Sequence, residues 1–348
     1  MPKVSLPKTT RVGRLVVLGL STAIVLAGCG AATQSKTSTS SVRHQLTPVS
    51  VGWTETAVES VEVEMARLAP KYGLRIALSQ YETRPLQAAA IEAGRIEFGT
   101  VTPPDVVGAL ALGDHNLVVL AGLANGADEL LCRTGVNVSS WSQLTGPNIT
   151  IRTFSGGIGW LKFIAGLDAH HINPRSLPNY STLTGTSAEL TTLLRTGNTD
   201  VEVNNDPYLE EAIAGGYGHL CSLNINDTPI GPSNGIFATS LTMVKQHPAT
   251  VQKVVDLYVA TMDKLRSSPS LWASVYNSFA GQTRQFAEAS FKHESLTLRI
   301  SLKDLQNAAQ LEYGLGLVTA DVAAQVPSAL NLSFAADASK KTVAYLES

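Results

Sequence analysis

The sequence is poor in the residues that bind nucleic acids, and most of it lacks the long apolar runs that cross membranes. Charged residues make up 16% of its 348 residues and aromatic residues 6%, and no stretch combines clustered lysine and arginine with interleaved aromatics. Because a nucleic-acid-binding surface needs such a basic patch, we expect no nucleic-acid partner. After Ala27, no apolar run approaches the roughly 20 residues that a membrane helix needs.

Motifs of common catalytic and metal sites are also scarce. The sequence contains no Walker phosphate-binding loop and no His-Glu-x-x-His motif. His170 and His171 are adjacent, so on a helix their side chains would point apart and would not easily share a metal ion. We therefore expect no enzymatic activity, no bound metal and no cofactor.

The beginning of the chain has the features of an export signal. Residues 3–14 carry four basic side chains and no acid, and the apolar segment Leu15–Ala27 is short for a bilayer span. The sequence Leu26-Ala27-Gly28-Cys29 then resembles a bacterial lipobox. This resemblance implies a signal peptide over residues 1–28, cleavage before Cys29 and acylation of its sulfur. The alternative is an uncleaved anchor helix with an incidental cysteine.

Cleavage at that point would leave 320 residues (348 minus 28), which is enough for two domain-sized units. The formal charge of −2 would become −6, because the discarded segment holds four cations. Residues 29–45 are small, polar and nearly free of large apolar side chains. Such a segment cannot bury a core, so we predict a flexible tether that holds the protein on the outer face of a membrane.

Only three cysteines occur, and Cys29 belongs to the lipobox-like segment. Cys132 and Cys221 remain, and in an oxidising compartment such a pair can form a disulfide. Two separately buried thiols are the alternative, because a bridge requires that the fold bring the two Cα atoms within about 7 Å.

From Leu46 onward, short apolar segments alternate with amphipathic ones. This alternation predicts mostly parallel sheets covered by helices, in two α/β lobes. The first helix is expected to open with Thr56–Glu59 as a capping box, and from Lys245 onward the pattern is mostly helical, with no clear strand alternation. The expected strands are Pro48–Trp53, Leu74–Leu78, Ile96–Val101, Leu117–Ala121, Leu130–Arg133, Ile149–Thr153, Pro178–Thr182 and Asp200–Val203.

In open sheets of this kind, ligands bind beyond the carboxyl ends of the strands. A binding site is therefore predicted at six strand-to-helix turns: Thr54–Thr56, Glu82–Arg84, Val101–Pro103, Phe154–Gly157, Ser181–Ser187 and Asn204–Asp206. Ser155, Gly156 and Gly157 precede a helix, whose unpaired amides and partial positive charge attract polar or anionic groups. We predict that these three residues contact a ligand; a tight turn that only packs strand against helix is the alternative.

Three larger side chains near these turns are further candidates. Trp53 ends the first strand and either stacks on a ligand or belongs to the core. Glu55, beside Thr54, either pairs with a ligand amine or remains a solvated carboxylate near a helix start. Arg84 either holds a carboxylate or sulfonate through two hydrogen bonds or forms a surface ion pair.

The order of these features resembles the substrate-binding proteins of ABC importers, in the nitrate, taurine, alkanesulfonate and thiamine-precursor group. The resemblance covers about residues 46–320. The segments that carry it, in order, are Val51-Gly52-Trp53, Leu86–Gly94 followed by Ile96–Gly99, Val138–Gly146, Phe154–Leu161, Leu194–Val203, Asn205-Asp206-Pro207 and Gly314–Val318. One departure is Gln143, which stands where the group usually has an aspartate.

The resemblance implies a type II periplasmic-binding-protein fold, in which two α/β lobes joined by two crossovers enclose a ligand cleft. Residues 46–124 would form the first part of lobe 1, residues 125–234 lobe 2, and residues 235–348 the return to lobe 1 with the C-terminal helices. Further ligand-binding candidates then lie at the expected crossovers and turns: Val101, Thr102, Asn125, Asp128, Tyr180, Asn205 and Asp206. Asp206 would alternatively cap the helix that begins at Pro207.

The function implied by the resemblance is that of a monomeric, lipid-anchored, extracytoplasmic binding protein that delivers a small organic solute to a permease and its ATPase. The solute class stays open between a sulfonate, a nitrate-like anion, a pyrimidine and related compounds. One arginine and several acids suit a mixed-charge or neutral polar ligand as well as a simple anion. A lipid-anchored sensor is the alternative function; an enzyme is a weaker one, since the cysteine-rich motif of a pyrimidine synthase with this fold is absent.

Overall fold

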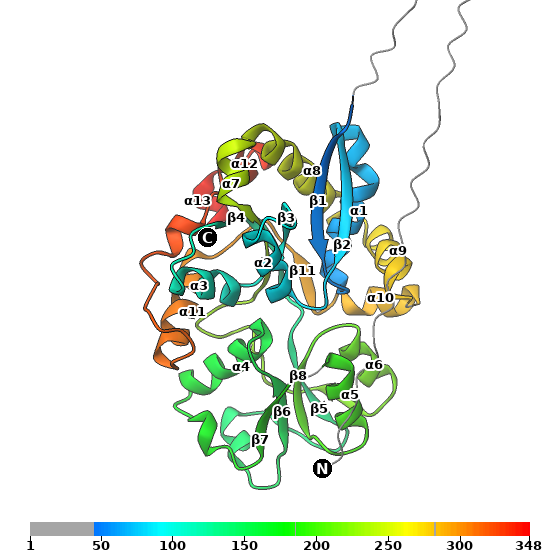
Figure 1. The fold of residues 1–348 in the computed structure, drawn as a ribbon. Coiled ribbons are helices and arrows are strands. Elements are labelled where there is room, and N and C mark those ends of the chain that lie inside the picture. Colours follow the sequence, from blue (N-terminus) through cyan, green and yellow to red (C-terminus); the bar gives the residue numbers. More distant parts are fainter. Residues whose placement is uncertain (1–44, 185, 282) are drawn as a thin grey trace, which may run out of the picture. The chain divides into compact units, whose positions relative to one another are not determined.

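The structure, a computed structural model, describes residues 45–184, 186–281 and 283–348 (Figure 1). The predictions for residues 1–44, which include the signal peptide, Cys29 and most of the tether, lie outside the described residues. The chain from residue 45 onward forms one compact unit built on two β-sheets. We call the six-stranded sheet with its helices the larger lobe, and the five-stranded sheet with its helices the smaller lobe.

The larger sheet has the strand order β11-β4-β10-β3-β1-β2. Strand β1 pairs in parallel with both β2 and β3, whereas β10 is antiparallel to β3 and β4, and β11 is antiparallel to β4. The strands are β1 (Thr47–Trp53), β2 (Leu74–Gln80), β3 (Phe98–Val101), β4 (Leu117–Gly126), β10 (Ser233–Ser240) and β11 (Glu294–Leu296).

The smaller sheet has the strand order β7-β6-β8-β5-β9. Strand β6 pairs in parallel with β7 and β8, while β5 is antiparallel to β8 and β9. The strands are β5 (Glu129–Arg133), β6 (Ile151–Phe154), β7 (Tyr180–Leu183), β8 (Val201–Asn204) and β9 (Gly218–Leu220).

Both sheets are mixed, which corrects the prediction of mostly parallel sheets. Strand β4 leads directly into β5 of the smaller sheet, and β10 brings the chain back into the larger one. A strand that enters a sheet from the cleft runs opposite to the strands that end there, so β5 and β10 are antiparallel to their neighbours. Strand β11 corrects a second expectation, because a strand does occur after Lys245.

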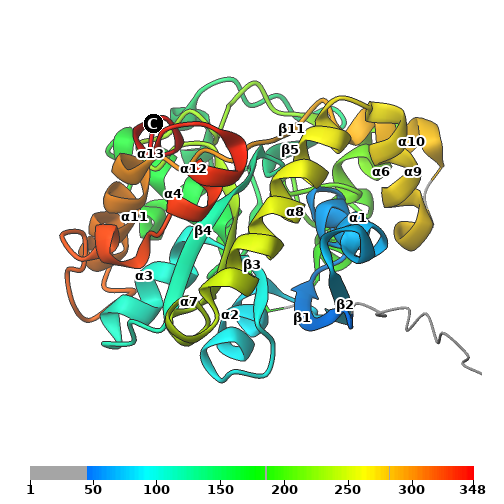
Figure 2. The same cartoon turned by 90° about the horizontal axis from the view of Figure 1, so that it is seen from above.

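Helices cover the faces of both sheets, and Figure 2 shows α8 lying across the strands of the larger sheet. Prolines stand in the first turn of α2, α3, α8 and α9, where the missing amide proton is tolerated. The α-helices are α1 (Ser60–Leu68), α2 (Arg84–Glu92), α3 (Pro103–Ala111), α4 (Ile158–Ala169), α5 (Ser187–Arg195), α6 (Tyr208–Ala214), α7 (Leu241–Gln246), α8 (Pro248–Arg266), α9 (Pro269–Ala280), α10 (Arg284–Ser290), α11 (Leu302–Gly314), α12 (Ser333–Ser339) and α13 (Val343–Leu346). Short 3-10 turns are η1 (Ala57–Glu59), η2 (Ala69–Tyr72), η3 (Trp141–Thr145), η4 (Pro174–Ser176) and η5 (Val326–Ala329).

Each lobe has its own apolar core. In the larger lobe, the ring of Phe237 stacks between Phe98 and Tyr258, with centroid distances of 5.9 and 4.2 Å. The buried Tyr258 hydroxyl donates a hydrogen bond of 2.7 Å to the Gly122 carbonyl, so its polar end is satisfied. In the smaller lobe, Trp141 packs so closely on α4 that a Cβ at Gly166 would collide with the indole.

A disulfide joins Cys132 in β5 to Cys221 just after β9, with an S–S distance of 2.01 Å and a Cα–Cα distance of 5.1 Å. Both residues are buried in the core of the smaller lobe. The structure therefore contains the bridge rather than two separate thiols.

We expect the double substitution Cys132→Ala/Cys221→Ala to lower the free energy of unfolding by about 2–4 kcal/mol, because the bridge closes a long loop in the unfolded chain. Urea unfolding under non-reducing conditions measures the change. An unfolding midpoint equal to that of the wild-type protein would contradict the expectation.

Candidate functional site

A cleft of about 800 Å³ lies between the two lobes. Each of the six predicted strand-to-helix turns contributes at least one residue to its walls. The reason is geometric, because β1, β2 and β3 of the larger sheet and β6, β7 and β8 of the smaller one end at this edge. The strand-to-helix turns predicted from the sequence therefore lie at the cleft.

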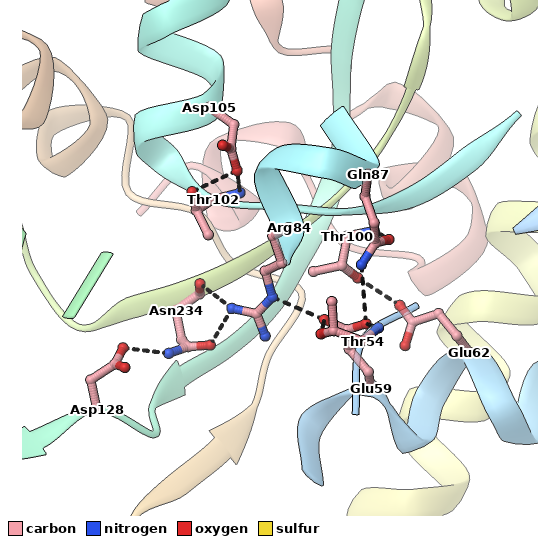
Figure 3. Close-up of polar contacts among 10 residues, drawn as sticks. All are labelled: Thr54, Glu59, Glu62, Arg84, Gln87, Thr100, Thr102, Asp105, Asp128 and Asn234. Carbon is pink, nitrogen blue, oxygen red and sulfur yellow. Dashed lines mark hydrogen bonds and ion pairs between the residues drawn. The ribbon is translucent and has the colours of Figure 1, made fainter. Parts of the chain in front are cut away.

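A chain of polar contacts crosses the floor of the cleft from one lobe to the other (Figure 3). Glu59 accepts a hydrogen bond of 2.9 Å from Arg84 Nε, and Arg84 Nη1 donates to Asn234 Oδ1 at 2.7 Å. Asn234 Nδ2 then donates to Asp128 Oδ2 at 2.6 Å, and this carboxylate oxygen lies 3.9 Å from Lys162 Nζ. We call these five residues the floor chain.

Arg84 uses two of its three side-chain nitrogens in hydrogen bonds within the protein. Besides its bonds to Glu59 and the Asn234 side chain, its Nη1 atom donates to the Asn234 carbonyl at 2.9 Å. Only Nη2 lacks a hydrogen-bond partner among the described residues, although the side chain lines the cleft. Arg84 thus forms an ion pair, but a buried one and not the surface pair considered from the sequence, and Nη2 is the nitrogen left for a ligand.

Glu59 takes a different role from the predicted capping box. Its carboxylate accepts from the backbone amide and hydroxyl of Thr54 as well as from Arg84, whereas Thr56 makes no side-chain capping bond. The 3-10 geometry of η1 turns Glu59 inward, where it is fully buried. The Thr54 hydroxyl, a predicted ligand contact, is therefore engaged within the larger lobe, although the residue still lines the cleft.

Lys162 fastens the smaller lobe to both crossovers. Its buried ammonium donates to the Asn226 side chain at 2.7 Å, to the Pro232 carbonyl at 3.0 Å and to the Gly126 carbonyl at 3.4 Å. Gly126 ends the outgoing strand β4, and Pro232 precedes the returning strand β10. Burial lowers the pKa of Lys162 to about 8, and the negative charges of Asp128 and then Glu129 oppose that shift. Burial likewise raises the pKa of Asp128, while Lys162 lowers it.

The glycine-rich turn before α4 presents open backbone to the cleft. Ser155, Gly156 and Gly157 all line it and are exposed, and no side chain caps the first turn of α4. Gly156 has a φ of +86°, which favours glycine, and a Cβ on Gly157 would meet nothing within 4 Å. The first amides of α4 therefore remain accessible to a polar group in the cleft.

Asp206 and Asn205 line the cleft from the turn between β8 and α6. Asp206 Oδ1 accepts a hydrogen bond of 3.1 Å from the Glu210 amide in the first turn of α6, although Pro207 and not Asp206 is the N-cap residue. Its second oxygen, Oδ2, is buried and has no partner among the described residues. On the opposite wall, Glu55 is exposed and accepts a bond of 3.2 Å from Gln80 Nε2. Thr102 also lines the cleft, and its hydroxyl donates to Asp105 at 2.6 Å in a capping box of α3.

Four predicted residues lie outside the walls of the cleft. Trp53 packs edge-on against Phe279 of α9 with a centroid distance of 5.0 Å, and Val101 is fully buried in the core. Asn125 lies in β4, opposite Ser233 and Ser295 of the neighbouring strands. The Tyr180 hydroxyl accepts a bond of 2.9 Å from Trp160 and lies 3.1 Å from the Thr153 hydroxyl. None of these four residues is among those that line the cleft.

Asn234 is the main site residue that the sequence did not indicate. It belongs to the segment Gly231–Gly235, which matches the Gly-x-Ser-x-Gly pattern of serine hydrolases. Ser233, however, begins β10 after a crossover and does not stand in a strand-to-helix turn, which that catalytic motif requires. In this structure the segment instead carries Asn234, whose side chain bonds to both Arg84 and Asp128.

The described residues contain no group of three or more histidines, cysteines and acids that could hold a metal ion. His170 and His171 are both exposed at the end of α4. In the part of the chain that the structure describes, no helix has the length and hydropathy of a membrane span.

Comparison with solved structures finds this fold in binding proteins of importers. The alkanesulfonate-binding protein SsuA from Xanthomonas axonopodis pv. citri, bound to MOPS, gives a TM-score of 0.68 at 18% identity, over 82% of this chain and 99% of its own. The periplasmic nitrate-binding protein NrtA from Synechocystis PCC 6803 gives a TM-score of 0.71 at 12% identity, and the match covers 85% of this chain and 89% of NrtA. A ligand-binding component of an ABC-type import system from Staphylococcus aureus, with zinc bound, gives a TM-score of 0.71 at 14% identity. That match covers 85% of this chain and 100% of the other.

These matches show that the chain has the predicted type II periplasmic-binding-protein fold. At such identities the likeness extends to the fold. No family model and no curated protein sequence matches the chain.

We expect Lys162→Met to lower the free energy of unfolding by about 3 kcal/mol, because it leaves the buried Asp128 carboxylate without its cation and removes the donor to the Asn226 side-chain oxygen. Lys253→Met on α8 is the matched control, since Lys253 is exposed and should change stability by less than about 0.5 kcal/mol. Urea unfolding of the three proteins measures both effects. Equal stability of Lys162→Met and Lys253→Met would contradict this account of the crossovers.

Proposed function

We propose that this protein is the extracytoplasmic solute-binding component of an ABC importer, which captures a small organic solute and delivers it to a permease driven by an ATPase. The observation that carries the proposal is the polar cleft itself. Residues at the strand ends of both lobes form its walls, and the fold is shared with ligand-binding proteins from several organisms. The expected lipid anchor at Cys29 would keep the protein close to its permease. We expect the protein to act as a monomer.

Capture would work through closure of the two lobes. Residues 46–124 and 235–348 would form one lobe and residues 125–234 the other, hinged at the two crossovers that Lys162 holds together. A solute in contact with Arg84 and Glu55 on one wall and with Asp206 on the other gains full contact only when the lobes are close. Binding would therefore shift the population toward the closed form, which the permease can distinguish from the open one.

The turn before α4 would hold a polar group of the solute. Ser155 offers a hydroxyl and Gly157 leaves the first amides of α4 uncovered, so that a sulfonate, carboxylate, nitro or carbonyl oxygen can approach them. The disulfide between Cys132 and Cys221 supports an oxidising, extracytoplasmic location.

Thermal unfolding of residues 30–348 against nitrate, taurine, alkanesulfonates, pyrimidines, amino acids and polyamines tests the proposal. A true ligand at a hundred times its dissociation constant should add about 2.7 kcal/mol of stability. Turnover of any of these compounds would contradict the proposal. A folded protein, free of carried-over ligand, that no compound stabilises would favour the sensor function instead.

We expect Gly157→Leu to weaken binding of the solute found in that panel at least tenfold, because the side chain would cover the amides at the start of α4. Gly157 is preferable to Gly156, whose positive φ would strain any substitution. Gly314→Leu at the end of α11 is the control, since a Cβ there also meets open space, away from the cleft. Unchanged affinity in a folded Gly157→Leu protein would contradict a ligand role for this turn.

A further inference from the structure

Four buried side-chain oxygens near one end of the cleft have no hydrogen-bond partner among the described residues. They are Thr56 Oγ1, Asp206 Oδ2, Tyr276 OH and Glu294 Oε1. Thr56 and Asp206 line the cleft, one from each lobe. An unpaired buried polar oxygen is costly. The two carboxyl oxygens lack a donor and the two hydroxyls lack any partner, so the four together point to a missing polar group.

Packing brings these four side chains to the same place. Tyr276 belongs to one apolar cluster with Ala57, the residue after Thr56, and β11, which carries Glu294, contacts η1. After burial itself, the negative charges of Glu294 and then Asp206 are the main causes that raise the pKa of the Tyr276 phenol. The elements that carry these residues are therefore neighbours, and Thr56 and Asp206 among them line the cleft. We call the four residues the acid end of the cleft.

The two bases nearest the acid end are already paired with other acids, Arg84 with Glu59 and His293 with Glu210. Among the described residues, Arg84 is the one basic side chain that lines the cleft. Four acids line it, Glu55, Glu82, Asp128 and Asp206, and of these Asp128 pairs with Lys162. His293 is the basic group beside Asp206, and its Nε2 atom lies 3.0 Å from Glu210 Oε1. The Ser290 hydroxyl donates a long hydrogen bond of 3.4 Å to the Phe286 carbonyl, and when it turns toward Asp206 it lowers the pKa of that carboxyl.

We infer that the solute carries a positively charged nitrogen, an ammonium or a similar N–H-bearing cation, which binds at the acid end between Asp206 Oδ2 and Thr56 Oγ1. This inference rests on the proposed function and narrows its solute class. An ammonium has three donors and no acceptor, which matches a place where acceptors lack donors. Its charge compensates the excess of carboxylates that Arg84 does not balance. Because Thr56 and Asp206 belong to different lobes, the same group favours closure.

Binding should then depend on the ionisation of Asp206. Burial raises the pKa of Asp206 to about 6, and His293 and then the hydrogen bond from the Glu210 amide oppose that shift. Glu294, which faces it from β11, has its own pKa raised well above the usual value by burial and by Asp206. Asp206 is therefore mostly protonated at pH 5 and mostly ionised at pH 7. Affinity for an ammonium should rise about tenfold between these two pH values.

Calorimetric titration with matched pairs tests the inference. The first two pairs exchange one ammonium for a hydroxyl, taurine with isethionate and 4-aminobutyrate with 4-hydroxybutyrate. The third pair, putrescine with 1,4-butanediol, exchanges two. In every pair that binds at pH 7, the ammonium compound should bind at least tenfold more tightly. Its advantage should shrink at pH 5 in the wild-type protein, an outcome that needs no variant.

Asp206→Asn should reduce the preference for the ammonium to less than threefold, while its Oδ1 atom still caps α6. Asp337→Asn removes the same charge from an exposed position on α12 and should keep the full preference. Hydroxyl compounds that bind as tightly as their amines, or an undiminished preference in Asp206→Asn, would overturn the inference and leave the proposed function standing. Absence of binding by all six compounds and by the wider panel would overturn both.

Discussion

The floor chain of Glu59, Arg84, Asn234, Asp128 and Lys162 is the interaction on which the rest of the site depends. It places two acids and two bases in alternation, with Asn234 between Arg84 and Asp128. Buried charges are tolerated only when they are paired and hydrogen-bonded, so each member holds the next in position. Because Arg84 belongs to the larger lobe and Lys162 to the smaller, the chain fixes both lobes to the crossovers between them.

This arrangement also determines the character of the cleft. Since the one arginine on its walls is already paired, the cleft offers little free positive charge beyond Arg84 Nη2 and the amides of α4. At the opposite end, the buried Asp206 Oδ2 atom has no hydrogen-bond partner among the described residues. Under the proposed function, such a pattern would change which solutes the cleft accommodates without changing the fold, which is shared with sulfonate- and nitrate-binding proteins.

The two-lobed fold and the position of the cleft could be predicted because they follow from local patterns: apolar strands, helix starts and the turns between them. The floor chain could not, because its bonds join residues far apart in the sequence, such as Arg84 and Asn234, which are 150 positions apart. The direction in which a side chain points could not be predicted from the sequence either. Trp53 ends a strand at the cleft edge, yet it packs on Phe279, a residue of α9 that the pattern did not connect to β1.

A crystal structure of the protein with its solute tests the central claim most directly. The account predicts that Arg84 stays bound to Glu59 and Asn234, and that a nitrogen of the solute lies within about 3 Å of Asp206 Oδ2. It would be contradicted by a structure in which Arg84 has left Glu59 to hold an anionic group of the solute, with nothing bound to Asp206.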